Sequence, residues 1–152
     1  MSELAALTLP PVTDVFRDEE LGLLETQVAA AELAVRNGRF DEVVRLLDDV
    51  RIVPAQYPDL ALRSLRAESW ARMYRGELDE AHELLKTAKA ITHRTGFNDV
   101  DRADVLCRIG AVRVRRGATS RAVNDLTLAL ELCTRSGRPC DRLRAEIYDW
   151  RS

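Results

Sequence analysis

The fold of this chain is decided by residues 106–126, which read LCRIGAVRVRRGATSRAVNDL. Before Gly117, apolar and small residues recur every three or four positions, which is typical of one buried face of a helix. After Gly117, Ala122 and Leu126 begin a second pattern of the same period. Because glycine adopts a left-handed backbone at low cost, Gly117 indicates a tight turn. The stretch therefore predicts two helices that pack against each other.

The same pattern occurs three times, at intervals of 38 and 41 residues. Its turns are centred on Gly38, Gly76 and Gly117. A small residue stands seven positions before each glycine, and a leucine stands nine positions after it. The matched residues are Ala31, Ser69 and Gly110, and then Leu47, Leu85 and Leu126. Such a recurrence indicates a helical repeat, in which the small residues let paired helices approach closely.

These residues resemble the tetratricopeptide repeat (TPR) family, whose unit combines a Leu-Gly pair in its first helix with Ala-x3-Phe in its second. The matching segments are Ile109-Gly110, Ala122-x3-Leu126 and Ala81-x3-Leu85. The chain departs from the family where an aromatic residue and a tyrosine are expected, at Leu65, Leu106, Arg72 and Arg113. Its period of about 40 residues also exceeds the 34 of the family. Units of this longer kind are similar to those of bacterial regulatory and signalling proteins.

The resemblance implies an all-α fold, a right-handed α-solenoid of antiparallel helix pairs with about three TPR-like units and a C-terminal helix. We expect a flexible leader at 1–13 and a repeat domain at 14–152. The units are expected at about 24–57, 62–98 and 103–138, and the last helix at 141–152. Individual helices are expected at about 14–37, 40–53, 59–75, 78–94, 100–116, 119–135 and 141–152. Another solenoid of helix pairs with a similar period is the nearest alternative.

The last helix leaves two interpretations open. Ile147 and Trp150 lie 41 residues after Leu106 and Ile109, so this helix matches the first half of a fourth unit. We therefore expect the chain to be the N-terminal part of a longer protein. Alternatively, the helix caps the array or forms a homodimer through its free face.

The composition is that of a folded, helix-rich protein without membrane spans. Hydrophobic residues make up 46% of the chain and charged residues 32%. No apolar run reaches the length of about 18 residues that a membrane span requires, and the N-terminal stretch lacks the features of a signal peptide. The expected location is therefore the cytoplasm. The net charge of −2 hides an uneven distribution, with −5 over residues 1–38 and +4 over residues 101–152.

The sequence offers little for catalysis. It contains none of the common phosphate-loop, nucleophile-elbow, zinc-protease or dinucleotide motifs. His82 and His93 lie eleven residues apart, about 16 Å along one helix, which is too far for joint work on one metal or proton. The three cysteines have no Cys-x-x-Cys spacing and are interpreted as free buried thiols. We expect no enzyme activity, no cofactor and no metal.

The candidate binding site comes from the first helix of each unit, which lines the concave groove in the TPR family. Arginine guanidinium groups bind carboxylates bidentately, and aromatic rings bind an apolar side chain. The groove therefore suits a peptide or protein that carries acidic residues. Trp70 and Tyr74 have an alternative role as packing between adjacent units. The expected partner-binding residues are Arg63, Arg66, Trp70, Tyr74, Cys107, Arg108, Arg115 and Tyr148.

The favoured function is a non-catalytic protein interaction module, the docking or sensing part of a larger bacterial regulatory or signalling protein. A small-ligand-sensing regulatory domain is the first alternative. A nucleic-acid binder is the second, because Arg113, Arg115, Arg116 and Arg121 surround the third turn. The acidic first unit and the absence of interleaved aromatic residues argue against nucleic acid.

Overall fold

The computed structural model describes the backbone of residues 12–152 and side chains from residue 18 onward. This part of the chain is all-helical, with seven helices and no strand. The expected leader at 1–13 lies almost entirely outside the described residues. The helices are α2 (Val12–Arg36), α3 (Phe40–Leu47), α4 (Pro58–Tyr74), α5 (Leu78–Thr92), α6 (Asp99–Arg115), α7 (Thr119–Ser136) and α8 (Asp141–Arg151).

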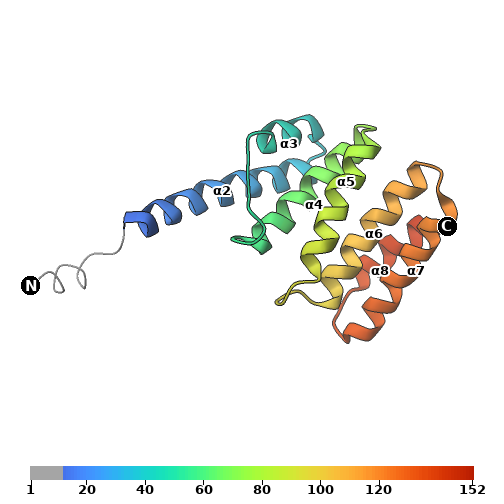
Figure 1. The fold of residues 1–152 in the computed structure, drawn as a ribbon. Coiled ribbons are helices and arrows are strands. Elements are labelled where there is room, and N and C mark those ends of the chain that lie inside the picture. Colours follow the sequence, from blue (N-terminus) through green and yellow to red (C-terminus); the bar gives the residue numbers. More distant parts are fainter. Residues whose placement is uncertain (1–11) are drawn as a thin grey trace, which may run out of the picture.

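Each helix packs against the next one in the chain (Figure 1). In addition, α2 contacts α4, α4 contacts α6 and α6 contacts α8, so the even-numbered helices form one continuous row. Among the described helices, α3, α5 and α7 do not contact one another. The N-terminal turns of α2 project from the body of the molecule. In the described residues, none of the helices is long and apolar enough to cross a membrane.

The turns form where the glycine pattern predicts them. Gly76 ends the turn after α4 with a φ of 84°, in the left-handed region that side chains avoid. Its N–H donates to the carbonyl of Met73, and the N–H of Glu77 donates to the carbonyl of Arg72. These bonds satisfy carbonyls at the end of α4, as in a Schellman motif. Gly96 also has a positive φ, but it lies beyond the end of α5, which stops at Thr92.

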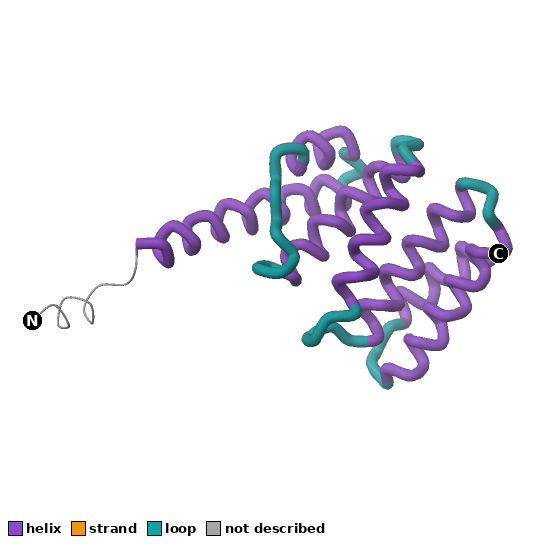
Figure 2. The backbone as a smooth tube through the Cα atoms, in the orientation of Figure 1, coloured by secondary structure: helices purple, strands orange, loops and turns teal. Residues whose placement is uncertain are grey.

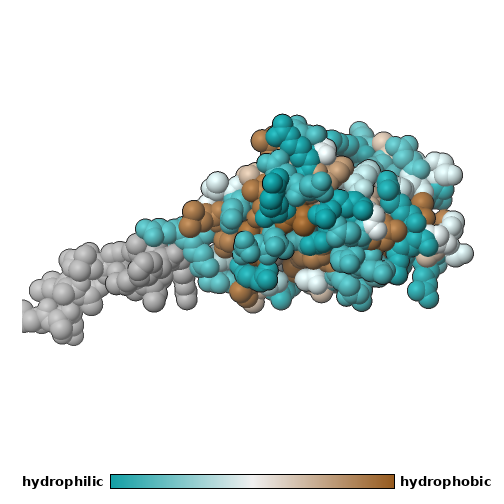
Figure 3. All heavy atoms as spheres, turned by 90° about the horizontal axis from the view of Figure 1, so that it is seen from above, coloured by the Kyte–Doolittle hydropathy of each residue, from teal (hydrophilic) through white to brown (hydrophobic). Residues whose placement is uncertain are grey.

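The core consists of buried apolar side chains between the two sets of helices. Leu85, Leu126 and Ile147 are among its largest fully buried members. Gly110 lies so close to α7 that an added Cβ would stand 2.7 Å from Leu126 Cγ, which explains the small residue at this repeat position. Most atoms on the face seen in Figure 3 are hydrophilic. Large apolar side chains that remain exposed are Leu23, Leu33, Val53, Tyr74, Val123, Leu128 and Tyr148.

The predicted end of one helix is wrong. We expected a helix at 40–53, whereas α3 ends at Leu47 and a long connection leads to α4 (Figure 2). Asp48 and Asp49 oppose extension, because carboxylates are unfavourable at the negative end of a helix. Pro54 also disfavours the helical conformation at the preceding residue. The other predicted helix boundaries agree with the structure to within two residues.

Candidate partner-binding groove

Four helices and one loop line a groove of about 640 Å³. Helices α2, α4, α6 and α8 each contribute one arginine to it, and the loop before α8 contributes Pro139 and Cys140. The arginines are Arg36, Arg66, Arg108 and Arg142, and the carboxylates are Asp101, Asp104 and Glu146. The four arginines are far apart in sequence, but the packing of the four helices brings them to one groove. We call this site the arginine groove.

The floor of the arginine groove is an ion-pair cluster. Asp104 Oδ2 lies 2.7 Å from Arg66 Nε and accepts a hydrogen bond of 3.0 Å from Arg108 Nε. The Asp104 side chain is mostly buried, at 15% exposure. Because its carboxylate holds two guanidinium groups from two helices, it ties α4 to α6 and keeps one positive charge in excess. By contrast, Arg36 and Arg142 have no ion-pair partner among residues 18–152.

Beside this floor, arginines pack on a set of aromatic rings, which we call the aromatic ladder. Arg108 lies over the Trp70 ring, with Cζ 4.8 Å from the ring centroid. Arg115 lies over Tyr74 at 4.7 Å and over Trp150 at 5.8 Å, so it joins α4 to α8. Trp70 and Tyr74 meet edge to face, and Tyr74 stacks on Phe40 at the start of α3. Each cation–π contact contributes roughly 0.5–2 kcal/mol, and together these contacts link α6 to α4 and to α8.

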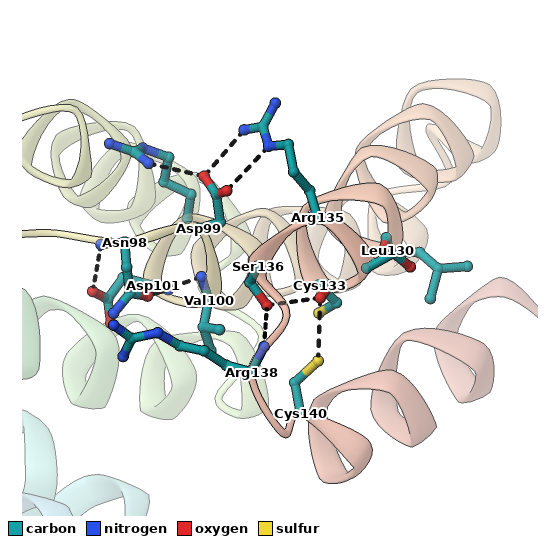
Figure 4. A network of polar contacts seen from close by, with 12 residues as sticks. Asn98, Asp99, Val100, Asp101, Leu130, Cys133, Arg135, Ser136, Arg138 and Cys140 are labelled. Atoms are coloured by element: carbon teal, nitrogen blue, oxygen red, sulfur yellow. Dashed lines mark hydrogen bonds and ion pairs between the residues drawn. The ribbon is translucent and has the colours of Figure 1, made fainter.

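A polar network joins α6, α7 and the loop that leads into α8 (Figure 4). Arg135 on α7 donates two hydrogen bonds of 3.0 Å to the Asp99 carboxylate at the start of α6. The carbonyl of Cys133 accepts from the Ser136 hydroxyl, at 2.7 Å, and from the Cys140 thiol, at 3.8 Å. These bonds set the chain direction from α7 into α8. They thereby position the loop and Arg142 at the groove.

Glu146 is a half-buried carboxylate of the groove. Burial raises its pKa, and repulsion from Asp104 and Asp149 adds to the rise, whereas attraction to Arg108 and Arg142 opposes it. A protonated Glu146 leaves the groove more positive. The groove therefore attracts anions more strongly as the pH falls through the pKa of this group.

Replacing Glu146 with glutamine is expected to raise the melting temperature at neutral pH and not at acid pH. The folded pKa lies above the unfolded one, so the stability contribution of Glu146 is complete below its unfolded pKa and is lost as the pH rises through its folded pKa. Because glutamine does not ionise, the variant does not lose this stability as the pH rises. Thermal unfolding of both proteins between about pH 4 and pH 8 measures the difference. A variant that is less stable at neutral pH would show that attraction to Arg108 and Arg142 outweighs burial.

The structure brings most of the predicted residues together. Arg66, Trp70 and Arg108 line the groove, and Tyr74 and Arg115 belong to the adjoining aromatic ladder. The remaining three are Arg63, Cys107 and Tyr148. Arg63 pairs with Glu32 of α2, outside the lining of the groove. Tyr148 is 54% exposed on α8 and also does not line the groove.

The prediction that Cys107 contacts a partner is corrected. Its side chain is 1% exposed because it packs in the core between α6, α7 and α8. Burial raises the pKa of its thiol to about 12, and burial with a hydrogen bond to Cys140 raises that of Cys133 to about 11. All three cysteines are free and buried, as predicted. Protonated, buried thiols are poor nucleophiles and poor metal ligands.

Sequence reasoning missed the acidic members of the groove and its last wall. Asp104 lies four residues before Arg108, a spacing that places both on one helical face, and this signal was present in the sequence. Arg142 and Glu146 have the same four-residue spacing, but whether they reach the groove depends on how α8 packs against α6. Trp150 of the aromatic ladder was missed for the same reason, and Phe40 was missed because its position depends on how α3 packs against α4.

No protein-family model, curated protein or solved structure matches this chain. The resemblance to the TPR family therefore rests on the residues of the chain alone. Its function is inferred from the shape and charge of the groove.

Proposed function

We propose that this chain is a non-catalytic interaction module of TPR type, which binds an acidic segment of a partner protein in the arginine groove. In this proposal the helix pairs form a right-handed solenoid with the even-numbered helices on its inner face. The convergence of four arginines from four helices in one groove is the observation that carries the proposal. The longer repeat period supports a role in a bacterial regulatory or signalling protein.

Charge and shape both favour an acidic occupant. Four guanidinium groups face three carboxylates, and one of these carboxylates, Glu146, has a raised pKa. Arg36 and Arg142 come from the two ends of the row of even-numbered helices and have no ion-pair partner in the described part of the chain, so they are free to bind carboxylates bidentately. Trp70 adds an apolar surface to the same groove. An extended or helical peptide with carboxylates on two sides of an apolar residue fits this arrangement.

The test uses two synthetic peptides. In the acidic peptide, leucine and glutamate occupy opposite sides of a helix, and in the basic peptide lysine replaces glutamate. We expect the protein to bind the fluorescently labelled acidic peptide. Charge reversal of Arg36 and Arg142 together is expected to weaken this binding by about tenfold or more, with an unchanged melting temperature. Arg66 and Arg108 are left intact, because reversing them would also break the cluster on Asp104.

The matched control is Lys86→Glu with Lys89→Glu on α5. Both lysines are exposed and lie outside the arginine groove, so this pair changes the net charge by the same amount. Equal weakening by both double variants would mean that net charge alone governs binding. A thermal shift with a small anionic metabolite but none with the acidic peptide would favour a ligand-sensing domain instead.

A further inference from the structure

A second groove lies on the opposite side of α4. Two adjoining cavities, of about 450 and 610 Å³, run between α4, α5 and the connection that follows α3. They share Glu68, Arg72, Leu84 and Thr87. Because a helix turns by about 100° per residue, Leu65 and Glu68 point away from the side that carries Arg66 and Trp70. We call this second site the acidic groove.

The acidic groove exists because α3 is short. In the repeat register, the positions that follow Leu47 correspond to the last turns of the second helix in the later units. In the later units these positions hold core residues. Ile91, for example, is 2% exposed. The corresponding residue of the first unit, Val53, has left the helix and is 55% exposed. The first unit therefore lacks the final turns of its second helix.

The missing turns leave apolar side chains uncovered. Leu65 is only half-buried, whereas Leu106 at the same position of the next unit is 4% exposed. Leu84 on α5 is half-buried as well, and both leucines line the groove. Val50 and Ile52 form its other wall. The floor is thus an apolar strip bounded by two helices and a loop, in the place where a helix would complete the repeat.

The rim of this strip is acidic. Its carboxylates outnumber its arginines by five to two, and they are Asp48, Glu68, Asp79, Glu80 and Glu83, against Arg51 and Arg72. Arg72 is already engaged, since it donates to Glu68 at 2.9 Å and to Glu77 at 2.8 Å. The exposed carboxylates of Asp79, Glu80 and Glu83 follow one edge of α5, where Asp79 pairs with Arg116 and Glu83 with Lys86 at the surface, and Glu80 pairs with neither. An occupant therefore meets apolar atoms below and negative charge at the side.

We propose that the acidic groove docks a cationic amphipathic helix of a partner protein, which supplies the turns that α3 lacks. Its leucine-like side chains pack on Leu65 and Leu84, and its lysines or arginines face the α5 carboxylates. Long basic side chains suit this rim, because their aliphatic stems cover apolar surface while their charges stay in water. The chain then carries two docking sites of opposite sign on the two sides of α4.

The basic peptide described above, carrying the same fluorescent label, tests this site. We expect it to bind, and we expect the acidic peptide not to compete for the same site. Glu80→Lys with Glu83→Lys should weaken binding of the basic peptide by about tenfold. The matched control is Glu19→Lys with Glu20→Lys on the exposed part of α2, which alters net charge equally. Circular dichroism and melting temperature confirm that each variant is folded.

The apolar floor is tested separately with Leu84→Ala. The side chain is half-buried, so this variant should fold while binding the basic peptide several-fold more weakly, and amide shifts in NMR spectra should move at α4, α5 and the connection after α3. Equal weakening by both charge pairs overturns the proposal, because it means attraction by net charge only. It is also overturned if Leu84→Ala binds normally, if the shifts cluster elsewhere, or if no binding occurs. The arginine-groove variant Arg36→Glu with Arg142→Glu should leave this binding intact.

Discussion

Replacing Leu126 with alanine is expected to lower the free energy of unfolding by about 2–5 kcal/mol. The side chain is fully buried on α7, and it packs in the cluster between α6, α7 and α8. Alanine removes its contacts and leaves a cavity, which the surrounding helices close only in part. Urea unfolding followed by circular dichroism measures the change, with the slope of the transition as a check on two-state behaviour.

The neighbour of Leu126 makes this prediction sharper. A Cβ at Gly110 would stand 2.7 and 2.8 Å from Leu126 Cγ and Cδ2, so Gly110→Ala alone should destabilise by about 1–3 kcal/mol through overpacking. In the double variant the added methyl group enters the space that Leu126 vacates. The double variant should therefore be more stable than the sum of the single effects by about 0.5–3 kcal/mol. Strict additivity would mean that α6 and α7 do not meet at these residues.

This pair also shows how far the sequence specifies the fold. The repeat pattern identified Gly110 and Leu126 from the sequence, because helix packing imposes a fixed period on both positions. The repeat pattern did not predict the end of α3. Apolar residues at Val50 and Val53 continue the period, and it is the two aspartates and Pro54 that stop the helix. A local breaking signal overrides the repeat there.

The arginine groove was predictable in part. Arg66, Trp70 and Arg108 lie on helices whose register follows from the repeat, so sequence placed them on one face. The same register placed Cys107 on this face. The repeat pattern alone does not distinguish a residue that lines the groove from a neighbouring residue on the same helix that points into the core. Glu146 and Arg142 come from α8, whose packing angle is a tertiary property. The charge of the groove thus depends on residues whose position in space no local pattern determines.

Asp104 links the stability of the molecule to the proposed binding. Its carboxylate contacts both Arg66 and Arg108, and so the floor arginines are engaged before any partner arrives. A carboxylate of the partner must therefore share Arg66 and Arg108 with Asp104, or bind Arg36 and Arg142 only. Removing the charge of Asp104 should therefore have two effects of opposite sign, one on folding and one on binding.

Asp104→Asn is expected to lower the free energy of unfolding by about 1–3 kcal/mol, because two mostly buried guanidinium groups lose their counter-ion. The same change is expected to strengthen binding of the acidic peptide several-fold, since Arg66 and Arg108 then pair with the carboxylates of the peptide. Urea unfolding measures the first effect and fluorescence anisotropy the second. The control is Asp125→Asn, which removes the partner of Arg113 on the far side of α6 and should cost stability without changing affinity. If Asp104→Asn weakens binding, the aspartate holds the arginines in place for the peptide, and does not compete with it.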